Sequence, residues 1–317
     1  MRELLRPPPH RGPLIAAGAV ALGVGLALEE LRLGDRLPSG CHMLLLLVAG
    51  ALIYWLGAQA PNEGGQPPAY QSVLLVTGLG LLYVGLLTAA DALGADGLSA
   101  GALVWTALVA LPLTVWPALE RNSAICLLLA AALGAVALLA GWRFLFGGSG
   151  QTAFRWLLLL LALACVLASL VLREPAPRHA QQLINAAGLA IAAIGLRAVA
   201  PALPADAARP VLPGFWEVVL LGAGFGLVAY GALDRAPGPA YLGVLNLGAF
   251  IAATALGAGQ TLYWWPLTLI VIGAVALGAG LRPRRPLPPE PRAYRAGEAP
   301  LAARADGDEI VMRVREE

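Results

Sequence analysis

Long apolar stretches alternate with short polar segments along the chain from residue 14 to residue 281. Each stretch is close to the ~20 residues that a helix needs to cross the hydrocarbon core of a bilayer. Apolar runs of this length lack the alternating pattern of a barrel strand, and a helix pairs its backbone polar groups internally. The pattern therefore predicts an all-α fold, a polytopic transmembrane helical bundle of about ten spans. We place the spans at residues 14–33, 41–60, 71–91, 98–119, 123–146, 153–172, 180–200, 215–233, 238–258 and 263–281.

The apolar stretches divide the chain into three parts. Residues 1–13 form a short N-terminal segment, residues 14–281 the transmembrane domain, and residues 282–317 a tail rich in arginine and proline. Repeated proline fixes φ and removes backbone donors, so we expect the tail to be extended and disordered. Its end, residues 309–317, could pair as a strand with a partner's sheet edge, although a solvated tail that contacts anionic lipid explains the composition more simply.

Composition limits the chemistry of the chain. Only 13% of the residues are charged and 59% are hydrophobic, whereas about a quarter of the residues of a soluble domain are charged. All 21 basic residues are arginines, which excludes chemistry that needs a lysine amine. Cys41, Cys126 and Cys165 lie within apolar stretches at unrelated spacings. We expect them to be free thiols that pack as small hydrophobic groups.

Arginine placement sets the expected orientation. With ten spans both termini lie on one side of the membrane, and that side collects 15 of the 21 arginines. Most of the excess comes from the termini, where Arg282, Arg284 and Arg285 directly follow the last span. Arginines near span ends are retained on the cytoplasmic side. We therefore expect a multi-pass protein of the cell membrane with both termini in the cytoplasm.

Ionisable residues lie within about a turn of the predicted span ends, where their side chains reach water. Asp91, Arg197 and Glu217 all map to the outer side. They are candidates for an outer polar vestibule, with an ion pair between Arg197 and Glu217. Ordinary interfacial charge explains the same three residues without a site.

Polar residues near the predicted midplane are few and uncharged. Asn246 lies near the centre of the ninth span, where an amide usually hydrogen-bonds a neighbouring helix for ~0.6–2 kcal/mol; contact with a substrate is the alternative. Pro112 removes a backbone hydrogen bond in the fourth span, and Thr106 and Thr114 are close enough to satisfy the freed groups. Interruptions in corresponding helices of two halves point to a transporter's midplane site. A five-plus-five division, with the second half inverted, is one arrangement that the span count allows.

The sequence contains no familiar catalytic or metal-binding pattern. Cys41, His42 and Met43 are consecutive helix residues, which point ~100° apart and cannot hold one ion together. No His-Glu-x-x-His motif occurs. We therefore assign no catalytic residue, no metal site and no cofactor. An unfamiliar active site in the outer vestibule is the remaining enzymatic alternative, and it requires ionisable side chains to cluster in a cleft. Those side chains are Glu29, Glu30, His42, Asp91 and Glu217.

In length and span count, with both termini inside, the membrane part resembles the drug/metabolite exporter superfamily. The resemblance implies transport and assigns no residues. We therefore expect transport of a small neutral or amphipathic solute through a midplane site near Asn246 and Pro112. The alternative is a non-enzymatic membrane scaffold that holds a cytoplasmic protein on its C-terminal tail. Under either interpretation the lipid bilayer is the surrounding partner, and no nucleic acid is expected.

Overall fold

A computed structural model describes residues 11–33, 38–61, 67–147, 150–199, 213–257, 270–271 and 273–274. All regular secondary structure in these residues is helical. Nine helices have their bounds there: α1 (Gly12–Leu33), α2 (Ser39–Ala58), α3 (Ala69–Ala92), α4 (Ala100–Glu120), α5 (Ala124–Phe146), α6 (Gln151–Leu172), α7 (Pro177–Val199), α8 (Gly214–Leu233) and α9 (Pro237–Gly257). The chain divides into two units, Met1–Gly259, which contains all nine helices, and Gln260–Glu317.

Six of the nine helices, α2 to α6 and α8, are long and apolar enough to cross a membrane. This supports a helical membrane protein. The nine helices lie where the hydrophobic pattern predicts them, with ends within three residues of the predicted ones. The tail at residues 282–317 lies outside the described residues, as does the predicted tenth span at residues 263–281 except for four helical positions.

Left-handed residues lie in the loops that follow several helices. Gly94 and Gly147 follow α3 and α5 with φ of 85° and 70°, a conformation that glycine adopts without steric penalty. In the α4–α5 and α8–α9 loops the same conformation falls on Asn122 (φ 54°) and Arg235 (φ 51°). Asparagine tolerates this conformation better than most residues with a side chain. Arg235 is therefore a strained position.

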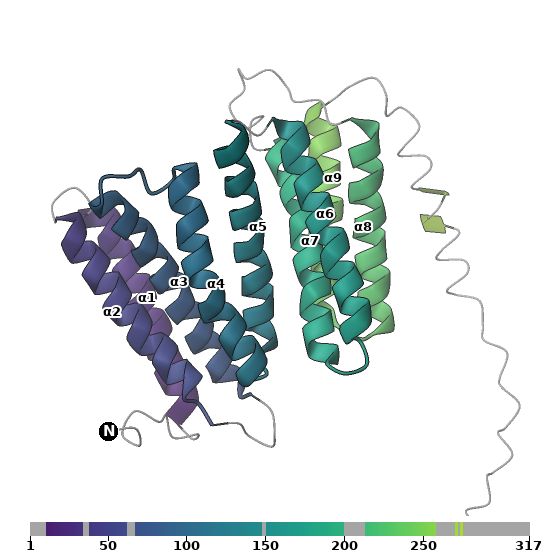
Figure 1. Ribbon diagram of the computed structural model, residues 1–317. Helices are drawn as coiled ribbons and strands as arrows, with labels where there is room; N and C mark the ends of the chain where they lie inside the picture. The colour runs from purple at the N-terminus through teal and green to yellow at the C-terminus, as the bar shows by residue number, and fades with distance from the viewer. Residues whose placement is uncertain are drawn as a thin grey trace, which may run out of the picture. The chain divides into compact units, whose positions relative to one another are not determined.

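The helices pack as a row of antiparallel hairpins (Figure 1). Each even-numbered helix lies along the odd-numbered helix that follows it, so that α2 pairs with α3, α4 with α5, α6 with α7 and α8 with α9. The odd-numbered helices contact one another in chain order, from α1 to α9. We call the end of the bundle where the odd-numbered helices begin the N-terminal face, and the opposite end the far face.

This packing repeats with every hairpin rather than with every five helices. A five-helix repeat would match the α1–α3 contact with one between α6 and α8, and the α7–α9 contact with one between α2 and α4. Neither counterpart is among the extensive contacts of the described helices. The packing therefore gives less support to a five-plus-five division than to a hairpin repeat.

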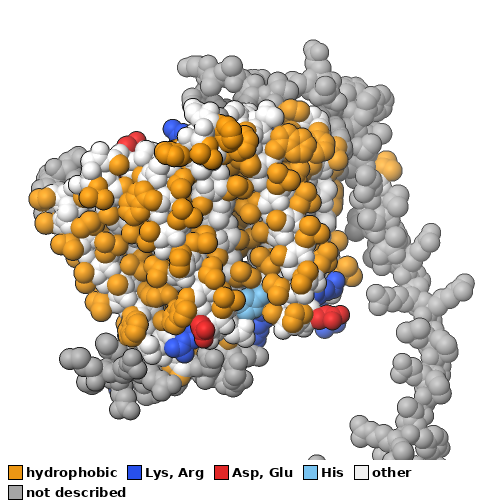
Figure 2. All heavy atoms as spheres, in the orientation of Figure 1, with side chains coloured by type: hydrophobic (Ala, Val, Ile, Leu, Met, Phe, Trp, Pro, Cys, Tyr) orange, Lys and Arg blue, Asp and Glu red, His pale blue; other side chains and the backbone are white. Residues whose placement is uncertain are grey.

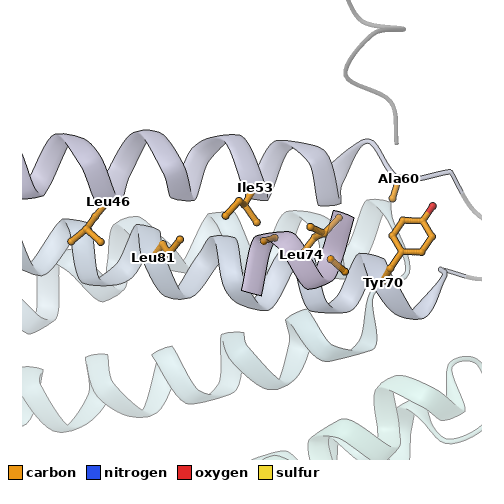
Figure 3. Close-up of a cluster of buried hydrophobic side chains, with 8 residues drawn as sticks. Leu46, Ile53, Ala60, Tyr70, Leu74 and Leu81 are labelled. Carbon is orange, nitrogen blue, oxygen red and sulfur yellow. The ribbon is translucent and has the colours of Figure 1, made fainter. Parts of the chain in front are cut away.

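The interior of the first hairpin is a layer of aliphatic side chains. Buried leucine and isoleucine side chains of α2 and α3 meet along the length of both helices, and a tyrosine ring lies at the end of this cluster (Figure 3). The labelled members are Leu46, Ile53, Ala60, Tyr70, Leu74 and Leu81. Because hydrocarbon outside the protein is as apolar as these side chains, close packing rather than exclusion of water holds such a pair together.

Glycines allow the paired helices to approach closely. A Cβ atom at Gly78 of α3 would lie 2.5 Å from the backbone nitrogen of Tyr54 on α2. In the last hairpin, a Cβ atom at Gly243 of α9 would lie 2.7 Å from the carbonyl oxygen of Gly224 on α8. Only glycine fits at such contacts, as in other small-residue interfaces of membrane helices.

The surface of the bundle also matches a hydrocarbon environment. Hydrophobic side chains cover the middle of the face shown in Figure 2, whereas charged and histidine side chains lie towards its ends. Large aliphatic side chains are exposed on the long helices, including Leu45 of α2, Leu108 of α4 and Leu163 of α6. An exposed apolar band of this kind is the expected surface of a protein in lipid.

Candidate functional site

The amide of Asn246 is fully buried in the middle of α9. Its Nδ2 group donates to the carbonyl oxygen of Gly188 on α7 (3.1 Å) and to that of Leu242 on its own helix (2.8 Å). Its Oδ1 atom is buried and has no hydrogen-bond donor among the described residues. Asn246 therefore joins α9 to α7 and keeps one acceptor for a further donor.

A second buried amide oxygen without a donor lies between the same two helices. Asn185, one turn before Gly188 on α7, donates from Nδ2 to Oε1 of Gln182 (3.0 Å), and its Oδ1 has no partner in the described part of the chain. Gly238 of α9 lies against this amide, because a Cβ atom there would fall 3.1 Å from its nitrogen and its oxygen. Hydropathy alone does not single out Asn185. The three amide side chains of Gln181, Gln182 and Asn185, within five residues of one another, were the signal that could have found it.

A polar cleft opens on the N-terminal face, where α7 begins and α8 ends. It has a volume of about 280 Å³, and its polar lining consists of Arg178, Gln181, Tyr230 and Asp234. Gln181 is one helical turn from Asn185, and both share the α7 face that carries Gly188. Gln181, Asn185 and Asn246, which we call the amide line, therefore follow one another from this cleft towards the middle of α9.

The two prolines of α4 have different surroundings. Pro112 lies on the exposed side of the helix, whereas Pro117 is buried. Because Pro117 has no N–H group, it frees the carbonyl of Leu113, four residues earlier. The hydroxyl of Tyr54 on α2 donates to that carbonyl oxygen (3.0 Å). A hydrogen bond between helices thus replaces the missing bond within α4.

The two buried threonines of α4 bond within their own helix. The Oγ1 atoms of Thr106 and Thr114 donate to carbonyls four and three residues earlier, each at 2.7 Å. Pro112 frees the carbonyl of Leu108, and neither hydroxyl bonds to that group, contrary to the sequence-based expectation. The reason is local, because a threonine in a helix reaches the preceding turn most easily.

The predicted midplane residues do not meet at one pair of helices. Pro112 lies on α4, which packs on α3 and α5, and Asn246 lies on α9, which packs on α7 and α8. The side chain of Pro112 faces the outside of the bundle. Of Pro112, Thr106, Thr114 and Asn246, only Asn246 has a buried side-chain atom without a hydrogen bond in the described structure.

The predicted vestibule charges lie at helix ends on the far face. Asp91 ends α3, and its Oδ1 atom accepts from the backbone N–H of Gly97, which stabilises the α3–α4 turn. Glu217, in the first turn of α8, is only 6% exposed, whereas Arg197, at the end of α7, is exposed. The expected ion pair between them is not among the described ion pairs, because one group is buried and the other lies on the surface.

An aromatic cluster joins α6 to α8 beside Glu217. The ring of Trp156 stacks on Phe215, with centroids 5.6 Å apart, and meets Trp216 edge to face at 5.2 Å. Aromatic rings of this kind are typical of the interface between hydrocarbon and headgroups. The cluster therefore indicates the level of one membrane surface.

Two contacts link separate hairpins on the N-terminal face. The Nε2 atom of His179 on α7 donates to the carbonyl oxygen of Ala118 near the end of α4 (3.2 Å). Arg173 and Asp234, in the α6–α7 and α8–α9 loops, form an ion pair at 3.3 Å. The arginine is 60% exposed, so this pair contributes about 0–1 kcal/mol. The buried histidine bond is the stronger link.

The described side chains hold no group of three or more His, Cys, Asp or Glu residues that could bind a metal ion. His42 is buried within α2, and the side chains of Glu29 and Glu30 lie outside the described residues. Comparison with known proteins finds no family model, no curated protein and no solved structure that matches the chain. A function must therefore be argued from the geometry of the bundle.

Proposed function

We propose that the protein transports a small neutral or amphipathic solute, with the amide line as its path and Asn246 as its contact in the middle of the membrane. The observation that carries the proposal is the buried Oδ1 atom of Asn246, an acceptor without a described donor inside an apolar helix. A hydroxyl or N–H group of a solute would complete this hydrogen bond and remove the cost of the unsatisfied oxygen. Pro112 would act by weakening α4 rather than by contact.

The charge distribution supports a solute without net charge. The charged side chains of the described helices lie near helix ends, whereas the middle of α9 offers an amide and the middle of α4 two hydroxyls. A charged solute would need compensating groups at the centre of the membrane, where each unpaired charge costs several kcal/mol. Amide oxygens are sufficient to accept a hydrogen bond from a neutral donor group of the solute.

The proposal includes a topology. Residues 263–281 would form a tenth span, and both termini would lie in the cytoplasm of a cell whose plasma membrane holds the protein. Support comes from the loops on the N-terminal face, which carry Arg121, Arg173 and Arg235, because arginines are retained on the cytoplasmic side. The tail at residues 282–317 would then be a cytoplasmic segment.

A ligand screen with the purified full chain tests the transport site. Small neutral and amphipathic solutes are ranked by the thermal stabilisation that they give, since a ligand of the folded state stabilises it by RT ln(1 + [L]/Kd). The best solute is then followed across proteoliposome membranes. We expect Asn246→Leu to abolish both the stabilisation and the flux. Thr254→Val is the matched control, because Thr254 lies on the same helix and bonds only to its own turn.

The outcome separates transport from the scaffold alternative. A solute whose stabilisation and flux survive Asn246→Leu would contradict the proposed site. If no solute in the screen stabilises the wild-type chain, transport is contradicted, and Asn246 is then a packing amide of a scaffold. In that case Asn246→Leu should lower only the stability, by about 0.6–2 kcal/mol.

A further inference from the structure

A cavity between α5, α6 and α7 has no polar side chain in its lining. Its volume is about 250 Å³, and it lies between residues 128–139 of α5, 154–161 of α6 and 186–193 of α7. All the lining residues are alanine, leucine, valine or phenylalanine. With no side-chain hydrogen-bonding group to orient a ligand, the cavity selects for hydrocarbon.

The packing of α5 explains why this space is open. α5 packs along α4 and α7 but contacts α6 only slightly, while α6 follows α7. Few residues of α5 are buried, namely Cys126, Ala130 and Ala140. Alanines face the gap from both sides, including Ala135 of α5 and Ala190 of α7, and their side chains are too short to fill it. The gap is thus a consequence of small residues on two helices.

The dimensions fit a segment of one unbranched chain. Residues 128 to 139 span about 16 Å along α5 at 1.5 Å per residue. The volume lies below the ~300–1,000 Å³ of pockets that hold drug-sized ligands, so the cavity takes a segment of an acyl chain rather than a rigid ligand of that size. An α-helix, with a diameter of ~10–12 Å including its side chains, also does not fit.

The cavity is reachable from the surrounding membrane. Two of its lining residues, Ala132 of α5 and Leu189 of α7, are exposed at the surface of the bundle. In a bilayer the species at this surface is the acyl chain of a lipid. A chain that enters the gap gains contacts on three sides, which the loosely packed lining otherwise lacks.

We propose that this cavity holds a segment of one acyl chain of a membrane phospholipid, bound between the α4–α5 and α6–α7 hairpins. The proposal is independent of transport. The amide line lies towards α9, where Gly188 and Gly195 of α7 contact Leu242 and Ala249, whereas the cavity faces α5 and α6. A bound chain would fill the gap between α5 and α6, which contact each other only slightly.

Photo-crosslinking tests the site in the full-length protein. The chain is placed in nanodiscs that contain a phosphatidylcholine with a diazirine on one acyl chain, and labelled peptides are identified by mass spectrometry. A second arm uses a diazirine fatty acid added in solution to nanodiscs of unlabelled lipid. We expect the phospholipid to label the lining segments of α5, α6 and α7 well above the exposed faces of α2 and α8.

Two variants close the cavity, and a third is their control. Ala135→Phe and Ala190→Phe place a ring in the gap and should abolish the preferential labelling. Ala164→Phe adds the same ring on the exposed side of α6, outside the lining, and should leave the preferential labelling unchanged. Uniform labelling of all lipid-facing segments in the wild-type chain would overturn the proposal without any variant. If only the fatty acid labels the lining segments preferentially, the chain in the cavity does not come from a phospholipid, and the proposal is overturned.

Discussion

Replacing Tyr54 with phenylalanine tests whether the hydrogen bond between α2 and α4 stabilises the bundle. The change removes one oxygen and leaves the carbonyl of Leu113 without a partner, because Pro117 supplies no N–H group. A buried carbonyl without a partner costs about 1–3 kcal/mol in soluble proteins. Hydrogen bonds between membrane helices average about 0.6 kcal/mol and reach about 1.7 kcal/mol. Because this carbonyl has no alternative donor, we expect a loss near the upper membrane value, about 1–1.7 kcal/mol in the free energy of unfolding.

The assay is reversible unfolding of the purified chain in bicelles. Tyr83→Phe is the matched control, since the hydroxyl of Tyr83 is buried without a described partner and its removal should be neutral or stabilising. Pro117→Ala restores an N–H group that can bond to the Leu113 carbonyl, so Tyr54→Phe should cost almost nothing in that background. Equal effects of Tyr54→Phe and Tyr83→Phe would refute the reasoning. So would an undiminished cost of Tyr54→Phe in the Pro117→Ala background.

Three further changes can be measured in the same assay. Gly78→Ala should destabilise the bundle strongly, because the added Cβ atom meets the backbone of α2. Gly80→Ala should stabilise it by up to about 1 kcal/mol, because a Cβ atom there has no other atom within 4 Å. A larger loss for Gly80→Ala than for Gly78→Ala would contradict the proposed close packing. Arg235→Gly should stabilise the protein by about 1 kcal/mol, because glycine adopts the left-handed conformation without the steric cost that a side chain brings. An unchanged unfolding midpoint would show that no strain is stored at this position. His179→Leu should cost about 1–3 kcal/mol because the Ala118 carbonyl loses its donor, and a neutral result would remove this link between hairpins.

Helix positions could be predicted from the sequence because one variable, hydropathy over ~20 residues, sets them in a bilayer. α7 shows that the hydrophobic pattern can also place a helix that begins with polar residues. Its first turns carry Arg178, His179 and Gln181, and it is not among the six strongly apolar helices. The hydrophobic pattern still places it, because its polar groups are grouped near its beginning, where His179 and Asn185 are buried against other helices.

The partners of the polar groups could not be predicted in the same way. The sequence shows two prolines in α4, and only the packing shows that the carbonyl freed by Pro117 faces Tyr54, 59 residues before Leu113. Asn246 could be selected from its position in an apolar helix, but its bond to Gly188 depends on the approach of α7 to α9. For the same reason, the ion pair expected between Arg197 and Glu217 is not among the described ion pairs. Closeness in sequence does not determine which side of a helix each group occupies.

The row of hairpins bears on how the chain can be made. Every extensive contact of the described bundle joins helices no more than two places apart in the chain. During synthesis, the main partner of each even-numbered helix would be the next helix to enter the membrane. Proteins built from neighbour contacts also assemble and come apart unit by unit. A nascent chain that ends after α5 would therefore already contain the extensive contacts of its first four helices, while α5 would still lack its contact with α7.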